Sequence, residues 1–585
     1  MNVFQMAISA VHSEFGTETY TYNSDELVVA LLPLKKDSTH NISRIFRTFA
    51  GEHQEPLHVA DGKFYGLLIL PQANSYDDSR CDVNSSFNVW VNHDDENRHQ
   101  EKRTLNFTFK DNVDSEARHK SAESIFLQAT MSTGVDAVEF LMNLLLIFRD
   151  SSASTNIEHL DVTIERVADH EVIVVPTARD CRADEEVEDL LPGHLQSSLE
   201  YAYPNALSFE ALVEALRAPP ELITEYLSEL INKNIVEQLD SGEYIRVNNF
   251  AKIVENKLHK SIAEKSPTIA IITSLFLENL AVTQVVENAN TMHMYNLNGD
   301  SNIYTVGNIG SHRVVVTKLS VIGDSRFATT SASSVTSRLL GNFQNVEHVL
   351  IVGVGGGIPN LTNPNEHVRL GDVVISSTRG GKNSAYVYAH DVVKQNGRIT
   401  GVTTRRWNPK EETFIDLLHE RGDEIQKKWL ENSEALIEKI NAENTENLDF
   451  TRPSSDVDYI PMEGVVVAHP NASRLHPVFH EGTVASMLHY TPPLDDSEYP
   501  IAQPSAQELR YDFLSKCGAK AFDAGFDSVI ASVVGNCINS YAVVRAIADY
   551  HSGTSRAGRA WQPYAAVNAA SFIKVLIEML PSSDE

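Results

Sequence analysis

Short apolar runs alternate with helical stretches along the chain from about Ser266 onward. Apolar runs bounded by turn residues predict buried strands, and strands separated by helices predict a largely parallel sheet covered by helices. The predicted strands are 268–273, 312–320, 348–354, 372–376, 463–469 and 540–549. Residues 266–585 are therefore predicted to form an α/β domain.

A polar segment, 411–444, interrupts this alternation with Glu and Lys at spacings that reach every face of a helix. A helix that is polar all round does not pack in a core. We expect a solvated helix pair outside the core of the α/β domain.

Residues 1–178 have a different pattern. The runs 26–34, 63–71 and 87–91 predict short strands, and the leucine-rich segment 135–148 predicts one core helix among them. We expect a β-rich α+β N-terminal domain, in which no motif points to a known family. An acidic connection, 179–190, marks its end.

The segment 190–250 has the pattern of a small separate module. Ser208 is placed to cap a helix over 209–216, and a second helix, over 221–234, follows two prolines that suit a first turn. Residues 235–247 have the pattern of a hairpin. This order of elements resembles a winged helix.

The second helix of this module carries Glu221, Glu225 and Glu229. A winged helix that reads DNA needs cationic or amide side chains there, because they meet phosphates and base edges. We therefore expect a protein-docking or spacer module, with DNA binding as the disfavoured alternative.

The charge of the whole chain also disfavours nucleic acid as a partner. The net charge of -31, from 79 acidic and 48 basic side chains, repels nucleic acid. Four cysteines without a C-x-x-C spacing favour a reducing compartment and give no metal site. The most apolar stretch, 138–148, is too short to span a bilayer, so we expect a cytoplasmic or nuclear protein without a membrane segment.

A glycine-rich turn follows the third predicted strand. The strand HVLIVGV runs directly into Gly355, Gly356 and Gly357, where a backbone without Cβ atoms lets a ligand approach closely. The string is neither a dinucleotide fingerprint nor a Walker motif. Upstream lies VIGDSR, downstream RLGDVVIS, and late in the chain FDAGFDSVIASVVGN, YAVVRAIADYHSGT and AWQPYAAVNAAS.

In this order, the motifs resemble those of the nucleoside phosphorylase and methylthioadenosine/S-adenosylhomocysteine nucleosidase superfamily. The likeness is greatest to its eukaryotic branch, in which the domain is fused to other modules. The resemblance covers just over half of the chain. It implies a central mixed sheet, a purine nucleoside ligand and cleavage of the N-glycosidic bond without a cofactor.

The resemblance also assigns the candidate catalytic carboxylates. Asp549 closes the VRAIAD strand and corresponds to the family's acid, which protonates the purine; the alternative is that it caps the next turn. Glu278 corresponds to the glutamate that orients the attacking water or the ribose; the alternative is a carboxylate favoured by a helix N-terminus.

Further candidates line the implied ligand site. The three glycines of the turn would approach the ligand, Arg326 would meet an anion, and Ser486 ends a segment, HEGTVAS, that matches the family's base-binding stretch. The arginines that hold phosphate in the similar phosphorylases have no counterpart in TSLFLEN or VGVGGGI. An active site would therefore hydrolyse its substrate rather than phosphorolyse it.

The sequence departs from the family at the ribose clamp. The family's methionine and glutamate fall on Ala524 and Gly525, so a carboxylate that binds the sugar hydroxyls is missing. Only a shift in alignment lets Asp523 or Asp527 replace it, each with a shorter reach. Loss of a charge-assisted bond pair removes several kcal/mol of binding.

Two hypotheses follow. In the first, the domain is a degenerate scaffold or nucleoside sensor whose protein partners bind the N-terminal region and the winged helix; in the second, it is an active purine nucleosidase. Because similar domains commonly associate, we also expect a homodimer. The missing clamp favours the first hypothesis.

Overall fold

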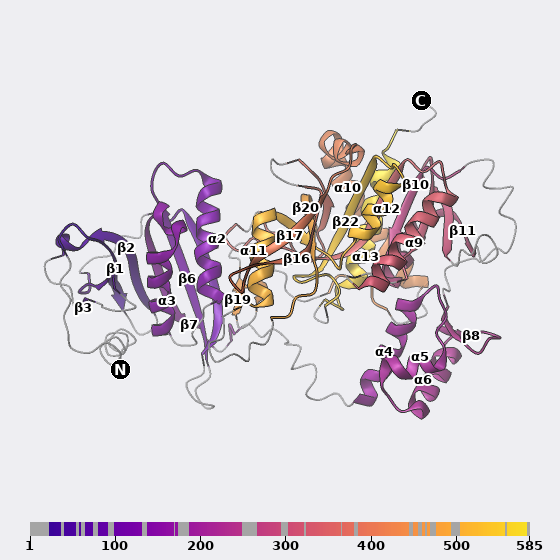
Figure 1. The fold of residues 1–585 in the computed structure, drawn as a ribbon, viewed down its shortest axis with the longest axis horizontal. Coiled ribbons are helices and arrows are strands. Elements are labelled where there is room, and N and C mark those ends of the chain that lie inside the picture. The colour runs from indigo at the N-terminus through magenta and orange to yellow at the C-terminus, as the bar shows by residue number, and fades with distance from the viewer. Residues whose placement is uncertain are drawn as a thin grey trace. The chain divides into compact units, whose positions relative to one another are not determined.

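A computed structural model describes the protein over residues 23–36, 40–53, 58–59, 65–73, 80–91, 99–131, 137–168, 170–172, 187–247, 266–293, 302–320, 323, 325–363, 366–379, 384–443, 448–453, 459–462, 465–468, 476–492, 503–555 and 558–581. The chain divides into two units (Figure 1). The first contains Met1–Val175, Asn360–His367 and Asp456–Ser473, and the second contains the rest.

The second unit is built on a mixed sheet with the strand order β11-β12-β13-β10-β14-β22-β15-β20-β16-β17. Its strands are β10 (Ile269–Thr273), β11 (Glu287–His293), β12 (Ile303–Ile309), β13 (His312–Lys318), β14 (His348–Gly357), β15 (Val373–Ser376), β16 (Tyr386–Gln395), β17 (Arg398–Trp407), β20 (Phe479–Met487), β21 (Ala519–Phe522) and β22 (Ser540–Asp549). β21 pairs with both β14 and β20, so that β14, β22, β15, β20 and β21 form a closed ring. All ten residues of β22 are buried at its centre.

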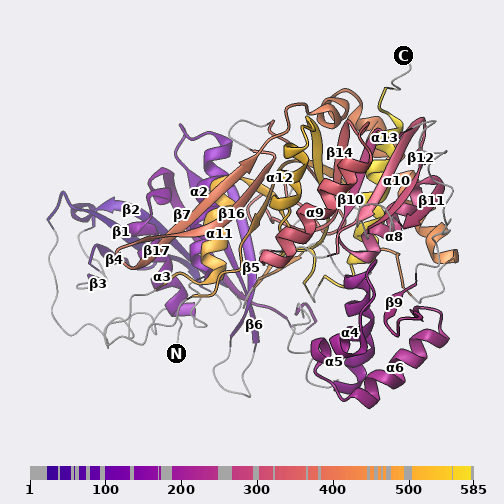
Figure 2. The same cartoon turned by 45° about the vertical axis from the view of Figure 1, so that its right-hand side comes forward.

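Helices cover both faces of this sheet, as the alternating pattern predicts. On one face, α9 (Arg326–Asn342) and α12 (Asp527–Gly535) share an apolar cluster with the strands. On the other lie α8 (Phe276–Val285), α13 (Gln562–Glu578) and α10 (Thr413–Glu443), while α11 (Ala506–Cys517) packs near β17 and β20. Figure 2 shows α8, α10 and α13 together.

Two expectations for this unit need correction. The predicted strand 463–469 does form, as β19 (Val465–Ala468), but it joins the sheet of the first unit, because strand periodicity does not specify a partner. The segment 411–444 does form two helical stretches, which meet at a kink at Arg421 within α10, but they do not lie outside the core. Ile425, Trp429 and Ile440 of α10 are fully buried.

The first unit is a nine-stranded sheet in the order β18-β19-β5-β6-β7-β2-β1-β4-β3. The strands are β1 (Leu27–Lys36), β2 (His40–Phe49), β3 (His58–Val59), β4 (Leu67–Ile69), β5 (Val83–Val91), β6 (His99–Phe109), β7 (Ile157–Arg166), β18 (Tyr459–Met462) and β19. Among the described residues of this unit, α2 (Ser115–Met131) and the expected α3 (Ala137–Asp150) pack with the sheet. The sequence pattern predicts α3 but not α2.

Residues 187–247 contain the helices and hairpin expected of a winged helix. Ser208 caps α5 (Phe209–Leu216), accepting a hydrogen bond from the N–H of Ala211 at 3.2 Å. α6 (Pro220–Asn232) follows, then the hairpin β8 (Val236–Gln238) and β9 (Tyr244–Arg246). A further helix, α4 (Val187–Ala202), precedes them and was not expected.

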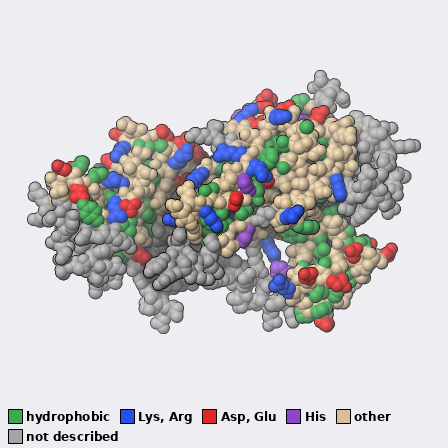
Figure 3. Space-filling model, in the orientation of Figure 1, with side chains coloured by type: hydrophobic (Ala, Val, Ile, Leu, Met, Phe, Trp, Pro, Cys, Tyr) green, Lys and Arg blue, Asp and Glu red, His purple; other side chains and the backbone are tan. Residues whose placement is uncertain are grey.

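The glutamates of α6, at 221, 225 and 229, are all exposed. Figure 3 shows acidic side chains over this module, at the lower right of the view. The buried side of α6 is apolar, with Ile223, Leu227 and Leu230 in the core of the module. Among the described residues, no helix is long and apolar enough to cross a membrane.

Candidate functional site

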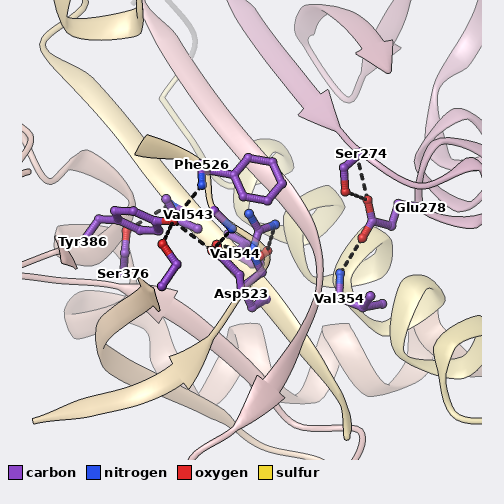
Figure 4. A network of polar contacts seen from close by, with 12 residues as sticks. Ser274, Glu278, Val354, Ser376, Tyr386, Asp523, Phe526, Val543 and Val544 are labelled. Carbon is purple, nitrogen blue, oxygen red and sulfur yellow. Dashed lines mark hydrogen bonds and ion pairs between the residues drawn. The ribbon is translucent and has the colours of Figure 1, made fainter. Parts of the chain in front are cut away.

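Glu278 is a buried carboxylate in the first turn of α8 and is 2% exposed. Its Oε2 accepts hydrogen bonds from the N–H groups of Ser274 and Leu275, both at 2.8 Å, and from the Ser274 hydroxyl at 2.9 Å. Its Oε1 accepts from the N–H of Val354 at 2.7 Å (Figure 4). A Cβ on Gly353 would stand 2.3 Å from Oε1. Glu278 therefore joins the start of α8 to β14.

Asp549, at the end of β22, is 5% exposed. Its Oδ1 accepts from the N–H groups of His551 and Gly553, both at 2.7 Å, and its Oδ2 from Ser555 at 3.0 Å. Both carboxylate oxygens are thus bonded by the turn that follows β22. This geometry is that of the turn-capping role.

The glycine strand lies directly beneath that turn. A Cβ on Gly356 would stand 2.2 Å from the carbonyl oxygen of His551, and one on Gly553 would stand 2.6 Å from the Cα of Gly355. Gly357 would meet Ile547 at 2.9 Å. The glycines at these positions are required because the protein's own backbone packs on them.

Asp523 lies in a buried polar network with Tyr386, Ser486 and Arg545. Figure 4 shows Asp523 beside Tyr386. The Tyr386 hydroxyl donates to Asp523 Oδ1 at 2.8 Å and accepts from the N–H of Phe526 at 2.8 Å. A phenol has one hydrogen, so the Ser486 hydroxyl at 2.7 Å donates to it. Burial, with the Asp523 carboxylate, raises the pKa of Tyr386 well above its usual value.

The other oxygen of Asp523 pairs with Arg545 at 3.0 Å, and the two side chains are 1% and 0% exposed. The Arg545 guanidinium also lies 4.1 Å from the centroid of the Phe526 ring. Its Nη2 is buried and has no hydrogen-bond partner among the described residues. No local sequence pattern points to Arg545, because only the fold brings it to Asp523.

Asp527 and Arg326 lie outside this network. The Asp527 carboxylate accepts from Arg405 and from the Trp407 indole, both at 2.7 Å. Arg326 is exposed at the start of α9. Gly525, the position that the sequence resemblance aligns with a glutamate, has φ of +105°, and a Cβ built there meets nothing within 4 Å.

A second group of buried residues joins the winged-helix module to the α/β domain. Lys318, at the end of β13, is 5% exposed. Its ammonium donates to the carbonyls of Tyr203 at 2.7 Å, Tyr201 at 3.1 Å and Leu319 at 3.0 Å. It thus satisfies carbonyls at the end of α4, which have no partner within the helix. Burial lowers the pKa of Lys318 to about 7, against the opposing effect of Glu278 and Glu200.

Phe276, the first residue of α8, is the aromatic centre of the same contact and is 3% exposed. The Tyr203 ring lies edge-on to it at 5.4 Å, and the Arg246 guanidinium lies 4.5 Å from its centroid. Arg246 also pairs with Glu200 at 3.3 Å. This contact was not predicted from the sequence, although Leu191, Leu195 and Leu199 repeat at helical spacing and mark α4.

A pocket opens beside this contact, with a volume of about 140 Å³. Its walls come from α4, from residues 275–277 at the start of α8, and from the connection between β22 and α13. We call it the seam pocket. Among the described residues, no three His, Cys, Asp or Glu side chains are grouped to hold a metal ion.

Comparison with known proteins gives three kinds of similarity. Residues 180–248 match a family described as a winged helix-turn-helix domain. A nucleotide-binding leucine-rich repeat (NLR)-like protein of Hyaloscypha variabilis is 37% identical over 98 residues, which are 16% of this chain and 9% of that protein. The match thus spans less than a tenth of the relative.

The similar solved structures are matched over about half of this chain. The 5'-methylthioadenosine/S-adenosylhomocysteine nucleosidase of Neisseria meningitidis, solved with methylthio-immucillin-A, is 15% identical with a TM-score of 0.31, over 53% of this chain and 99% of that one. Futalosine hydrolase of Helicobacter pylori is 14% identical with a TM-score of 0.32, over 54% and 100%.

Proposed function

We propose that the α/β domain is a nucleosidase-like module that does not cleave nucleosides and acts instead as a nucleoside sensor and protein-interaction scaffold. The observation that most directly supports the absence of cleavage is the environment of Gly525. No side chain stands at the position of the family's clamp glutamate, and the space beside it is open. A ribose there would lack the carboxylate that accepts its hydroxyl hydrogen bonds.

Neither neighbouring aspartate supplies this carboxylate. Asp523 is 2% exposed and is held by Arg545 and Tyr386, while Asp527 is held by Arg405 and Trp407. Turning either toward a ligand would leave a buried or partly buried donor without its acceptor, at a cost of about 1–3 kcal/mol per bond. These bonds support the absence of turnover.

The bonds of Asp549 and Glu278 support it further. Each carboxylate accepts hydrogen bonds at both oxygens from the chain's own donors. A general acid or a water-orienting base must instead reach a ligand. The turn after β22 also covers the glycine strand, which would otherwise line the site.

Retained ligand binding is favoured by Arg545. Its Nη2 is a buried donor without a hydrogen-bond partner among the described residues, and such a donor is costly unless something accepts from it. A hydroxyl of a purine nucleoside, the ligand class that the sequence resemblance implies, is a suitable acceptor. Binding without cleavage is the behaviour of a sensor.

The scaffold part of the proposal rests on the winged helix. Its α6 turns three exposed glutamates outward, while α4 and the hairpin carry the contacts with the α/β domain. An acidic helix complements a basic protein surface and repels a phosphate backbone. We propose a basic protein partner for this face, further partners at the N-terminal unit, and a homodimer as the assembled form.

The test is incubation of the purified chain with adenosine, inosine, guanosine, methylthioadenosine and S-adenosylhomocysteine, with and without phosphate. Free base is measured by chromatography beside an Asp549→Asn variant. We expect no base above background from either protein, and adenosine binding to both by calorimetry. Base released by the parent chain and lost in the variant would establish the nucleosidase instead.

A further inference from the structure

The seam pocket has a position and a size suited to a small ligand. It lies where β10 and β22 end, and the carboxyl ends of strands are where open α/β sheets bind ligands. Its volume of about 140 Å³ is close to that of cavities of roughly 150 Å³ that bind benzene. A single ring or a phosphate group fits that volume.

The charges around the seam pocket are not balanced. The Glu200 carboxylate is already bonded to Arg246 at 3.3 Å and to the Gln196 amide at 2.8 Å. Arg559 lines the pocket as an exposed side chain, and it has no hydrogen bond or ion pair among the described residues. Among the described residues that line the pocket, Arg559 is therefore the charged side chain without a partner.

Neutral donors stand beside this charge. Tyr201 and Thr554 line the same pocket, and both carry a hydroxyl; that of Thr554 also lies 3.2 Å from the Ser552 hydroxyl. Burial raises the pKa of the Tyr201 phenol, as does Glu278, while Arg559 opposes them. Tyr201 consequently stays protonated and can donate a hydrogen bond at physiological pH. The ligand that complements a guanidinium and two hydroxyl donors is an anion with several acceptor oxygens.

The walls of the pocket belong to two parts of the chain. Glu200 and Tyr201 come from α4, which precedes the winged helix, whereas Phe276 and Arg559 come from the α/β domain. In Figure 2 α4 points toward α8. A ligand that contacts both walls binds only while they are together, and it therefore stabilises the docked arrangement.

We propose that the seam pocket binds a compact organic anion, with a phosphate or carboxylate group at Arg559, and that the bound anion holds the winged-helix module against the α/β domain. This site is separate from the network of Asp523 and Arg545, and it gives the protein a second means of sensing. Occupancy would decide how firmly the acidic α6 face is presented to a partner.

The test uses the full chain with two anions, ribose 5-phosphate and benzoate, and with neutral ribose. Binding is measured by calorimetry, and docking by hydrogen exchange of the amides in α4 and the first turn of α8. We expect at least one anion to bind and to slow exchange in both segments, with no effect of ribose. The anion that binds identifies the phosphate or the carboxylate source.

Two variants test the assignment to the pocket. Arg559→Gln should weaken anion binding about tenfold or more and abolish the slower exchange, and Tyr201→Phe should weaken binding less. Arg338→Gln, at an exposed arginine of α9 outside the pocket, should change neither. Binding by neither anion, binding unchanged in Arg559→Gln, or binding that leaves exchange in α4 unaltered would each overturn the proposal.

The outcome is independent of the proposed function. Free base released from nucleosides would contradict the absence of turnover and leave anion binding at Arg559 unaffected. Conversely, failure of both anions to bind would not bear on the absence of turnover, which rests on the missing carboxylate at Gly525.

Discussion

The ammonium of Lys318 donates a hydrogen bond of 2.7 Å to the backbone carbonyl of Tyr203. Lys318, the last residue of β13, thereby binds a carbonyl at the C-terminal end of α4. When it is protonated, its charge also complements the negative end of the helix dipole. The two modules of this unit are consequently joined through a buried amine, and because burial opposes its charge, the stability of the contact depends on its protonation.

The first prediction concerns pH. The folded-state pKa of Lys318 is about 7, below its usual value of 10.5, so between these values the unfolded chain binds more protons than the folded chain. The free energy of unfolding should therefore rise with pH from about 7 to 9, by about 2 kcal/mol from this residue. Urea unfolding of the parent and of Lys318→Met at both pH values measures the difference, and the variant should lack this part of the rise. Identical slopes in the two proteins would contradict the assignment.

The second prediction concerns the aromatic centre of the same contact. Phe276 is 3% exposed between Tyr203 and Arg246, so Phe276→Ala should destabilise the contact by about 3–5 kcal/mol. Hydrogen exchange should become faster in α4. The matched control is Phe327→Ala, at a phenylalanine that is 73% exposed in the first turn of α9 and should cost little. Equal effects of the two substitutions would argue against a docked module.

The third prediction concerns the buried ion pair. Asp523→Asn leaves the Arg545 charge unpaired in a site without solvent, so we expect a loss of about 3–5 kcal/mol in the free energy of unfolding. Asp527→Asn is the control, since its Arg405 partner is half exposed and such pairs contribute about 1 kcal/mol or less. Chemical denaturation monitored by fluorescence distinguishes the two. A small effect at Asp523 would mean that it is free enough to serve a ligand.

The fourth prediction concerns the strand that joins the first unit. Val467 of β19 is fully buried and pairs with Phe87 of β5. Val467→Asp buries an unpaired charge and should open this edge of the sheet, with faster proteolysis within residues 80–109. Val534→Asp, at a valine that is 39% exposed on α12, should leave that region protected. Unchanged protection in Val467→Asp would show that β19 is dispensable.

The sequence predicts where strands and helices form better than it predicts which strands pair with each other. β22 has the bounds that its apolar run predicts, 540–549, because ten consecutive buried residues leave little choice of structure. The hairpin of β16 and β17 was missed although Asn396 and Gly397, both at positive φ, form the Asn-Gly turn typical of hairpins. Helix α4 was missed as well. Because proline usually breaks a helix, Pro192 weakens the helical pattern of the leucines in α4.

The candidate site was predictable only in part. The motifs placed Asp549 at the end of a strand, where the structure has it, whereas Glu278 lies in the first turn of α8 and the glycines, expected in a turn, form the last residues of β14. Their hydrogen-bond partners were not predictable, because Val354 lies 76 residues from Glu278, and Arg545 lies 22 residues from Asp523. Pairings over such separations depend on the packed fold and leave no mark in local sequence patterns.

The strands β18 and β19, which complete the sheet of the first unit, are synthesised long after the other strands of that sheet. The ribosome finishes residue 175 about 300 residues before it finishes Ser473, the end of the segment that contains β18 and β19. At translation rates of roughly 5–20 residues per second, β5 stays an open edge for about 15–60 s. An unpaired edge recruits other strands, so the nascent chain needs protection during that interval. A chaperone that binds extended segments is the expected companion of this protein on the ribosome.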